Sequence, residues 1–275
     1  MIENIQHGEV RQIAMKPDPP IAPAFWVSAY FVDGMIIDSG CRHTHAELVE
    51  SLDDQRLLVG VNTHYHEDHI TANGELMERH GIRFHAHPES IPLIGSFPEL
   101  PWYREDCWGR PESSETLPIP DRIETERFVF DVVETPGHCR GHVALLEQER
   151  GWCFTGDLYV GKKLLVAGPE TDIAALTASM IKLLDIDTEE LILFTSLRTV
   201  EMDGKSALRE AVRYFEDLCG SAKLMHSKGM ETGAIRDRLL GGPDPLDHVT
   251  GGRYSTERLI AGAIEAELPQ STISG

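Results

Sequence analysis

The feature that most constrains this chain is a run of histidines and carboxylates at residues 63–69, which reads THYHEDH. It follows the apolar run Leu57–Val61, which predicts a buried strand, and it precedes a helical pattern at 70–79. A further strand is expected at 83–86. Strand, loop, helix and strand in this order are typical of an α/β unit. Four candidate metal ligands therefore lie where a strand gives way to a helix.

The spacing of these residues suits metal binding. Alternate side chains of an extended loop point to the same side, so His64 and His66 can bind one ion together. Asp68 and His69 lie further along, at the start of the helix, where they can face a second ion. Neutral imidazole and carboxylate suit Zn²⁺, and the same ligands also bind iron or manganese. We expect one or two Zn²⁺ ions, with Fe²⁺ or Mn²⁺ as alternatives.

Two later segments each present one candidate ligand at the end of a predicted strand. The strand expected at 128–134 runs into a Thr-Pro-Gly turn that ends in His138. The strand expected at 152–155 ends in a glycine followed by Asp157. Ligands at strand ends are held by the sheet and open toward a crevice, although each segment alone also fits an ordinary turn.

Together, these segments resemble the metallo-β-lactamase superfamily of metallohydrolases, whose signature is HxHxDH, then TPGH, then GD at a strand end. The resemblance spans about residues 25–199 and implies an α/β fold, an αββα sandwich with a metal centre along one edge of its two sheets. It implies that His64, His66 and His138 bind the first metal, that Asp68 and His69 bind the second, and that Asp157 bridges them. It also implies that two residues support the site without binding metal, namely Asp38 and His142.

One residue departs from the family pattern. The strand expected at 191–194 is followed by Thr195-Ser196-Leu197, and Leu197 stands where the resemblance expects a histidine. Leucine cannot coordinate metal, so the second site is expected to be weakened. The site then holds one metal, or holds two with water or the Ser196 hydroxyl in place of imidazole, or takes a histidine from elsewhere. The candidates for such a histidine are His43, His45, His87, His226 and His248.

A site of this kind predicts a hydrolase. Water bound to such a metal has its pKa lowered toward about 7 and attacks the carbonyl of an ester, thioester, lactone or related substrate. Asp68 can hydrogen-bond that water and carry a proton to the leaving group, which makes it the expected catalytic residue.

Two other functions stay open. His64, His138 and Asp157 could form the facial triad of a mononuclear non-haem iron dioxygenase acting on a sulfur substrate, as in the sulfur dioxygenases that share this fold. Alternatively, the chain is a degenerate member of the family that binds a ligand without turnover. Metal analysis separates the three functions: zinc or manganese with ester hydrolysis, iron with oxygen consumption, or no metal.

Composition limits the expected partners. The 275 residues carry 25 basic and 45 acidic side chains, which gives a formal charge of −20. Such a charge repels nucleic acid, so we expect a small-molecule substrate. The sequence shows no signal-peptide pattern and no run approaching the roughly 20 apolar residues of a membrane span, which predicts no membrane contact and a cytoplasmic location. Five cysteines without CxxC spacing are expected to be reduced: Cys41, Cys107, Cys139, Cys153 and Cys219.

The chain is expected to divide into two parts. Residues 1–204 form the αββα domain, with an aromatic and proline-rich insert at about 88–120 that lacks helical or strand periodicity. Residues 205–275 form a helical extension packed on the same domain, with helices at 205–219, 232–240 and 256–266. This extension is expected to cover the crevice or to form a homodimer contact. Aromatic side chains are expected to contact a partly apolar substrate: Trp26, Trp102, Tyr103 and Trp108, with Phe25 beside them.

Overall fold

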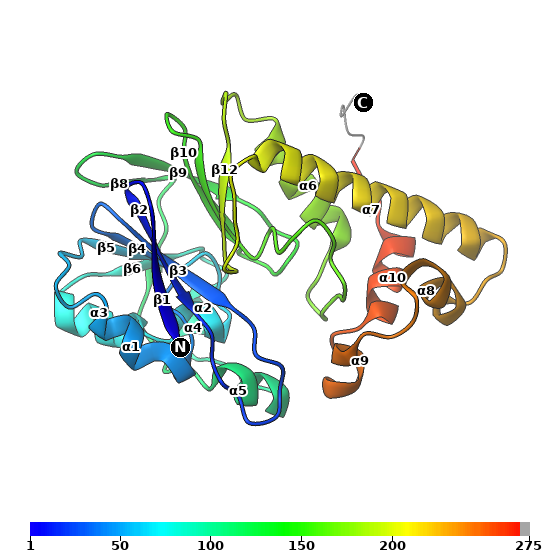
Figure 1. The fold of residues 1–275 in the computed structure, drawn as a ribbon, viewed down its shortest axis with the longest axis horizontal. Helices are drawn as coiled ribbons and strands as arrows, with labels where there is room; N and C mark the ends of the chain where they lie inside the picture. The colour runs from blue at the N-terminus through cyan, green and yellow to red at the C-terminus, as the bar shows by residue number, and fades with distance from the viewer. Residues whose placement is uncertain (270–275) are drawn as a thin grey trace.

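Two β-sheets pack face to face, and helices cover the outer face of each (Figure 1). The structure is a computed structural model that describes residues 1–269. The layers, in the order helix, sheet, sheet and helix, confirm the predicted αββα sandwich.

The first sheet has seven strands that follow one another in chain order. Its first four strands are antiparallel, whereas β4 to β7 run parallel, so the loops that follow β4, β5 and β6 emerge at one edge. The strands are β1 (Ile2–His7), β2 (Val10–Met15), β3 (Val27–Val32), β4 (Met35–Ile37), β5 (Val59–Val61), β6 (Phe84–Ala86) and β7 (Leu117–Pro118).

The second sheet has six strands in the order β13-β12-β11-β10-β9-β8. Both β9 and β11 pair antiparallel with β10, and β12 pairs parallel with β11, so β9, β11 and β12 end at the same edge. The strands are β8 (Arg122–Glu124), β9 (Val129–Glu134), β10 (Val143–Glu147), β11 (Trp152–Gly156), β12 (Ile192–Thr195) and β13 (Val200–Glu201).

Buried strands place alternate residues in different layers of the core. Met35 and Ile37 lie between the two sheets, whereas Ile36 packs with the helices outside the first sheet. In β11, Phe154 lies between the sheets and Cys153 faces the helices of the second sheet. Both faces of each sheet are therefore covered, as the near-continuous apolar runs of these strands require.

Helices α1 and α3 cover the first sheet, α6 and α7 cover the second, and α10 packs against α7 (Figure 1). Among residues 1–269, none of the helices is both long and apolar enough to cross a membrane. A 3₁₀ turn, η1 (Arg42–Thr44), precedes the first helix. The helices are α1 (His45–Glu50), α2 (Glu67–Ile70), α3 (Asn73–His80), α4 (Ile91–Gly95), α5 (Trp102–Trp108), α6 (Ile173–Leu184), α7 (Gly204–Ser227), α8 (Thr232–Leu240), α9 (Pro245–Val249) and α10 (Thr256–Glu265).

The helix expected at 70–79 is broken into α2 and α3. The N–H groups of Thr71 and Ala72 donate to the carbonyl oxygens of Gly40 and Ser39 instead of continuing the helix. The turn after β4 therefore takes the hydrogen bonds that a continuous helix would have used, and it fixes α2 against the first sheet. Further along, α7 continues past its expected end at Cys219 to Ser227.

The segment 88–120 is not the aperiodic loop that was expected, because it contains the short helices α4 and α5. In α5, Tyr103 and Cys107 are buried at a spacing of four residues, while Trp102 is 54% exposed. Gly109, with a φ of 75°, ends the helix. A single buried stripe over so few residues is too short to show a period in the sequence.

Sequence patterns predicted no strand before residue 25, yet β1 and β2 form a hairpin there. Gly8 lies in the turn between them with a φ of 62°. Strand β1 forms the edge of the sheet and contains no fully buried residue, so its apolar alternation is weak. The division of the chain at residue 204 stays a prediction.

Candidate metal centre

Six candidate metal ligands gather at the edge where β5, β9 and β11 end. Residues 63–69 follow β5, His138 follows β9 through the Pro-Gly turn, and Asp157 directly follows β11. We call this group the metal edge; its members are His64, His66, Asp68, His69, His138 and Asp157.

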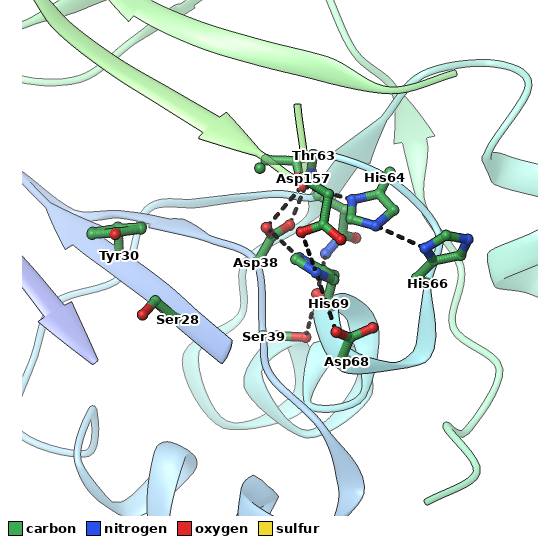
Figure 2. Close-up of polar contacts among 12 residues, drawn as sticks. Ser28, Tyr30, Asp38, Ser39, Thr63, His64, His66, Asp68, His69 and Asp157 are labelled. Carbon is green, nitrogen blue, oxygen red and sulfur yellow. Dashed lines mark hydrogen bonds and ion pairs between the residues drawn. The ribbon is translucent and has the colours of Figure 1, made fainter. Parts of the chain in front are cut away.

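Asp38, at the end of β4, holds the loop that carries four of these ligands (Figure 2). Its carboxylate accepts the main-chain N–H and the hydroxyl of Thr63, both at 2.8 Å. It also accepts the Nδ1–H of His69 at 2.7 Å. This last bond directs His69 Nε2 away from Asp38 and toward the other ligands.

Four ligands of the metal edge converge on a first metal position. The candidate ligand atoms of His64, His66, His138 and Asp157 all lie within 4.8 Å of one another. His66 Nδ1 is 3.1 Å from His64 Nε2 and 2.9 Å from His138 Nε2. His138 Nε2 is 3.2 Å from Asp157 Oδ2. Ligands at about 2.1 Å from one tetrahedral ion lie roughly 3.4 Å apart, so these residues fit a Zn²⁺ ion.

A second position has fewer ligands. His69 Nε2 is 3.5 Å from Asp68 Oδ2 and 3.4 Å from Asp157 Oδ1, and it is buried without a hydrogen-bond partner in the described part of the chain. In Figure 2, His69 lies between Asp38, Asp68 and Asp157. Burial alone would lower the pKa of His69, but these three carboxylates raise it well above its usual value. The carboxylates therefore favour positive charge at this position.

Burial keeps the imidazoles of the first position neutral. It lowers the pKa of His64 well below its usual value, and the neighbouring histidines lower it further. It lowers the pKa of His66 to about 4, and the Arg104 guanidinium adds to this effect. Burial would raise the pKa of Asp157, but His138 and His69 lower it well below its usual value. Neutral imidazole and ionised carboxylate are the forms that bind metal.

His142 supports the metal edge from beneath. Its Nε2 accepts the main-chain N–H of Asp157 at 3.1 Å, so its Nδ1–H donates to the hydroxyl of Thr135 at 2.9 Å. The ring is buried and connects the ends of β9 and β11. Asp38 and His142 thus both contact residues of the metal edge, and their role in supporting a metal stays a prediction.

Sequence reasoning missed Glu170, which contacts two residues of the HYHEDH motif. His66 Nε2 lies 3.2 Å from a Glu170 carboxylate oxygen, and the Tyr65 hydroxyl donates to the same carboxylate. The hydrogen bond from His66 lowers the pKa of Glu170 to about 2. A carboxylate of this kind orients an imidazole that binds metal through its other nitrogen. No local motif marks Glu170, which lies 104 positions from His66.

A buried ion pair connects the metal-ligand loop to the insert and to the C-terminal segment. Arg104 of α5 donates from Nε and Nη2 to the two carboxylate oxygens of Glu67, both at 2.6 Å. Its Nη1 donates to the Tyr254 hydroxyl at 3.2 Å. Glu67 is fully buried, so burial raises its pKa while the Arg104 guanidinium opposes that rise. Neither partner was predicted from the sequence.

A cavity of about 180 Å³ opens beside the metal edge, with His66, Asp68, His138 and Asp157 among its lining residues. Of the aromatic residues expected to contact substrate, Tyr103, Trp108 and Phe25 line this cavity. Trp102 and Trp26 do not line it. Trp102 points to solvent, and Trp26 lies against the cationic groups of Lys16 and Arg198.

Leu197 lies in the turn after β12, next to the end of β11. The carbonyl oxygen of Leu197 accepts hydrogen bonds from the side chains of Ser28 and Gln12, and that of Thr195 accepts one from Tyr30, so the turn is held firmly against the first sheet. The adjacent Ser196 hydroxyl oxygen is buried without a hydrogen-bond partner among the described residues.

None of the alternative histidines considered from the sequence joins the metal cluster that the described residues form. His43 contacts the main-chain oxygen of Asp106, His45 pairs with Glu75, and His87 lies 3.4 Å from Glu134. The remaining two are exposed, namely His226 and His248.

Comparison with known proteins agrees with the fold and the motif order. The family model of the Metallo-beta-lactamase superfamily matches residues 24–195. This chain therefore belongs to the metallo-β-lactamase superfamily. A crystal structure of a beta-lactamase domain protein from Burkholderia ambifaria superposes with a TM-score of 0.70 at 16% identity, over 94% of this chain and 86% of that chain. At that identity, the likeness shows the fold alone.

Curated relatives add names for parts of the chain. This chain is 34% identical over 102 residues to hydroxyacylglutathione hydrolase from Thermosynechococcus vestitus. That alignment covers 36% of this chain and 34% of the relative. The chain is 28% identical over 153 residues to hydroxyacylglutathione hydrolase GloC from Haemophilus influenzae, which covers 51% of this chain and 68% of that protein. The chain thus aligns with only about a third of the first relative's length.

Proposed function

We propose that this protein is a metal-dependent hydrolase that cleaves a small thioester or ester. The observation that carries the proposal is the convergence of four ligands at the first metal position, directly beside an open cavity. Membership of the metallo-β-lactamase superfamily supports hydrolysis. The two relatives named as hydroxyacylglutathione hydrolases support a thioester as the bond that is cleaved.

The first position is the one that we propose to be catalytic, and Zn²⁺ fits its donor set of three imidazoles and one carboxylate. A divalent ion bound there supplies water with a pKa near about 7 and polarises a carbonyl oxygen. Asp38, Glu170 and His142 hold the ligands in place through the hydrogen bonds described above. The second position, for which Leu197 stands where the family pattern has a histidine, is proposed to bind metal more weakly.

Asp68 is the proposed proton carrier. It lines the cavity and is only 9% exposed. Burial alone would raise its pKa, but His69 lowers it, so the carboxylate is ionised and can accept a proton at neutral pH. With the second metal position weak, Asp68 is free to take a proton from the attacking water and pass it to the leaving thiol or alcohol.

A metal-reconstitution assay tests this proposal. Protein stripped with a chelator and reloaded with Zn²⁺, Mn²⁺ or Fe²⁺ is incubated with a panel of thioesters, esters and lactones. We expect hydrolysis that depends on the added metal and that falls in Asp68→Asn while its metal content is retained. Oxygen consumption by the iron form with a sulfur substrate would instead favour the dioxygenase. Metal binding without turnover of any substrate would favour a non-catalytic member of the family.

A further inference from the structure

The cavity beside the metal edge has a wall built from three segments that are far apart in the chain. They are the loop before β3, the helix α5 of the insert, and the segment of α9 with the residues after it. Helices α5 and α9 both lie at the lower edge of Figure 1. We give the name pocket wall to six of the lining residues from these segments: Pro23, Phe25, Tyr103, Cys107, Trp108 and Tyr254.

Contacts between these segments form the pocket wall without a ligand. The rings of Phe25 and Trp108 lie with centroids 6.3 Å apart, and those of Tyr103 and Tyr254 lie edge to face at the same distance. The Cys107 thiol contacts the carbonyl oxygen of Pro23 at 3.4 Å. A wall that is already packed costs little ordering when an apolar group enters it.

Apart from the proposed metal position, the described residues that line the pocket supply no unpaired cationic side chain. Arg104 is the sole lysine or arginine among the described residues that line it. All three guanidinium nitrogens of Arg104 already donate hydrogen bonds, two to Glu67 and one to Tyr254. A substrate carboxylate would therefore meet a guanidinium whose charge is already paired with the fully buried Glu67 carboxylate.

The neighbouring cavity does not supply a net positive charge either. It has a volume of about 320 Å³ and lies on the other side of Arg104 and Tyr254. Besides Arg104, this cavity is lined by one more cation, Arg253, and by two carboxylates, Glu99 and Glu170. The formal charge of −20 on the whole chain adds long-range repulsion of anions.

We infer that the pocket wall binds an uncharged, apolar group of the substrate and discriminates against glutathione, a tripeptide thiol with two carboxylates. This inference rests on the proposed function and specifies its substrate class. The cavity of about 180 Å³ is small beside the roughly 300–1,000 Å³ of pockets for drug-sized ligands, so the group is short. The substrate is thus a short-chain acyl thioester or ester of an uncharged thiol or alcohol.

A binding experiment with two thioethers that cannot be hydrolysed tests this inference. Zinc-loaded protein is titrated calorimetrically with S-hexyl-N-acetylcysteamine, which is uncharged, and with S-hexylglutathione, which carries the same alkyl chain. We expect the uncharged thioether to bind at least tenfold more tightly. Lengthening its alkyl chain from butyl to hexyl should tighten binding by about fourfold per methylene. Equal or tighter binding of the glutathione thioether, or binding of neither, would overturn the inference.

Two tryptophans of α5 provide matched variants. Trp108→Ala removes part of the pocket wall and should weaken binding of the uncharged thioether by at least tenfold. Trp102→Ala changes an exposed side chain outside the cavity and should leave binding unchanged. Circular dichroism and the milder Trp108→Phe control for loss of folding. Equal effects of the two alanine variants would contradict the assignment of the wall.

This binding assay separates the two proposals because it needs no turnover. If the uncharged thioether binds as expected and no thioester or ester is hydrolysed, the proposed activity fails while the pocket assignment stands. If uncharged thioesters are hydrolysed but glutathione compounds bind more tightly, the hydrolase stands and the inferred substrate class is wrong.

Discussion

The metal edge and the pocket wall meet at one cavity but are built in different ways. Every ligand of the metal edge lies on one of three short segments that directly follow strands β5, β9 and β11. The pocket wall comes from three segments that do not follow these strands. Ring contacts and a few hydrogen bonds between the segments bring them together. In the proposed function, the metal edge would cleave the bond and the pocket wall would select the substrate.

Loss of one ligand of the metal edge should have the largest effect. Asp157→Ala removes a carboxylate that faces both metal positions and should abolish tight zinc binding, lowering kcat/KM roughly 10³-fold or more for every substrate. Zinc content and kcat/KM are measured together. His226→Ala, which changes an exposed histidine far along the chain, should match the unmodified protein. Full zinc content in Asp157→Ala would contradict the assigned ligand set.

The ion pair between the edge and the wall should matter mainly for stability. Arg104→Ala leaves the fully buried Glu67 carboxylate without its partner and should lower the free energy of unfolding by about 3 kcal/mol. Denaturant titration of the metal-free protein measures this change. Arg79→Ala, which breaks an exposed pair with Asp53, should have little effect. Similar curves for the two variants would show that Arg104 does not hold Glu67.

Mild acid should destabilise the metal edge through His142. Burial lowers its folded-state pKa to about 3, so the unfolded chain, with a pKa near about 6.5, binds the proton first. Stability is therefore lost as pH falls below about 6.5, by about 2 kcal/mol from this one group at pH 5. Denaturant titrations of metal-free protein at pH 7 and pH 5 measure the loss. His142→Gln should show a smaller loss, and equal losses would contradict a buried neutral imidazole.

Restoring the missing ligand should have the smallest effect and should act on the second metal position alone. Leu197→His is expected to raise the affinity for a second zinc equivalent at least tenfold, while the first equivalent binds as before. Calorimetric zinc titration resolves the two equivalents. Leu197→Ala controls for loss of the leucine side chain. Unchanged affinity for the second equivalent in Leu197→His would mean that residue 197 does not face this position.

The sequence brought the members of the metal edge to notice because four of them lie in one short motif and the other two lie in motifs of the family pattern. In HYHEDH the spacing itself brings side chains together, and His138 and Asp157 each follow an apolar run that ends in a glycine-containing turn. The strands β5, β10 and β11 were predictable because they are short, buried and strongly apolar, whereas the layered fold was predicted through the family resemblance.

The partners of the edge and most of the wall could not be predicted in this way. Glu170 contacts His66 across 104 positions, and Arg104 contacts Tyr254 across 150. Such contacts depend on how loops close, which no local periodicity encodes. Of the aromatic residues that the sequence singled out in residues 88–120, Tyr103 and Trp108 line the cavity and Trp102 does not, a separation that depends on the turn of α5. Their contact with substrate stays a prediction.

The most direct test of the account is the position of the bound metal. Crystals grown with Zn²⁺ and measured on both sides of the zinc absorption edge would give an anomalous difference map. The account predicts the strongest peak between His64 Nε2, His66 Nδ1, His138 Nε2 and the Asp157 carboxylate. A strongest peak elsewhere, with none among these four residues, would contradict it.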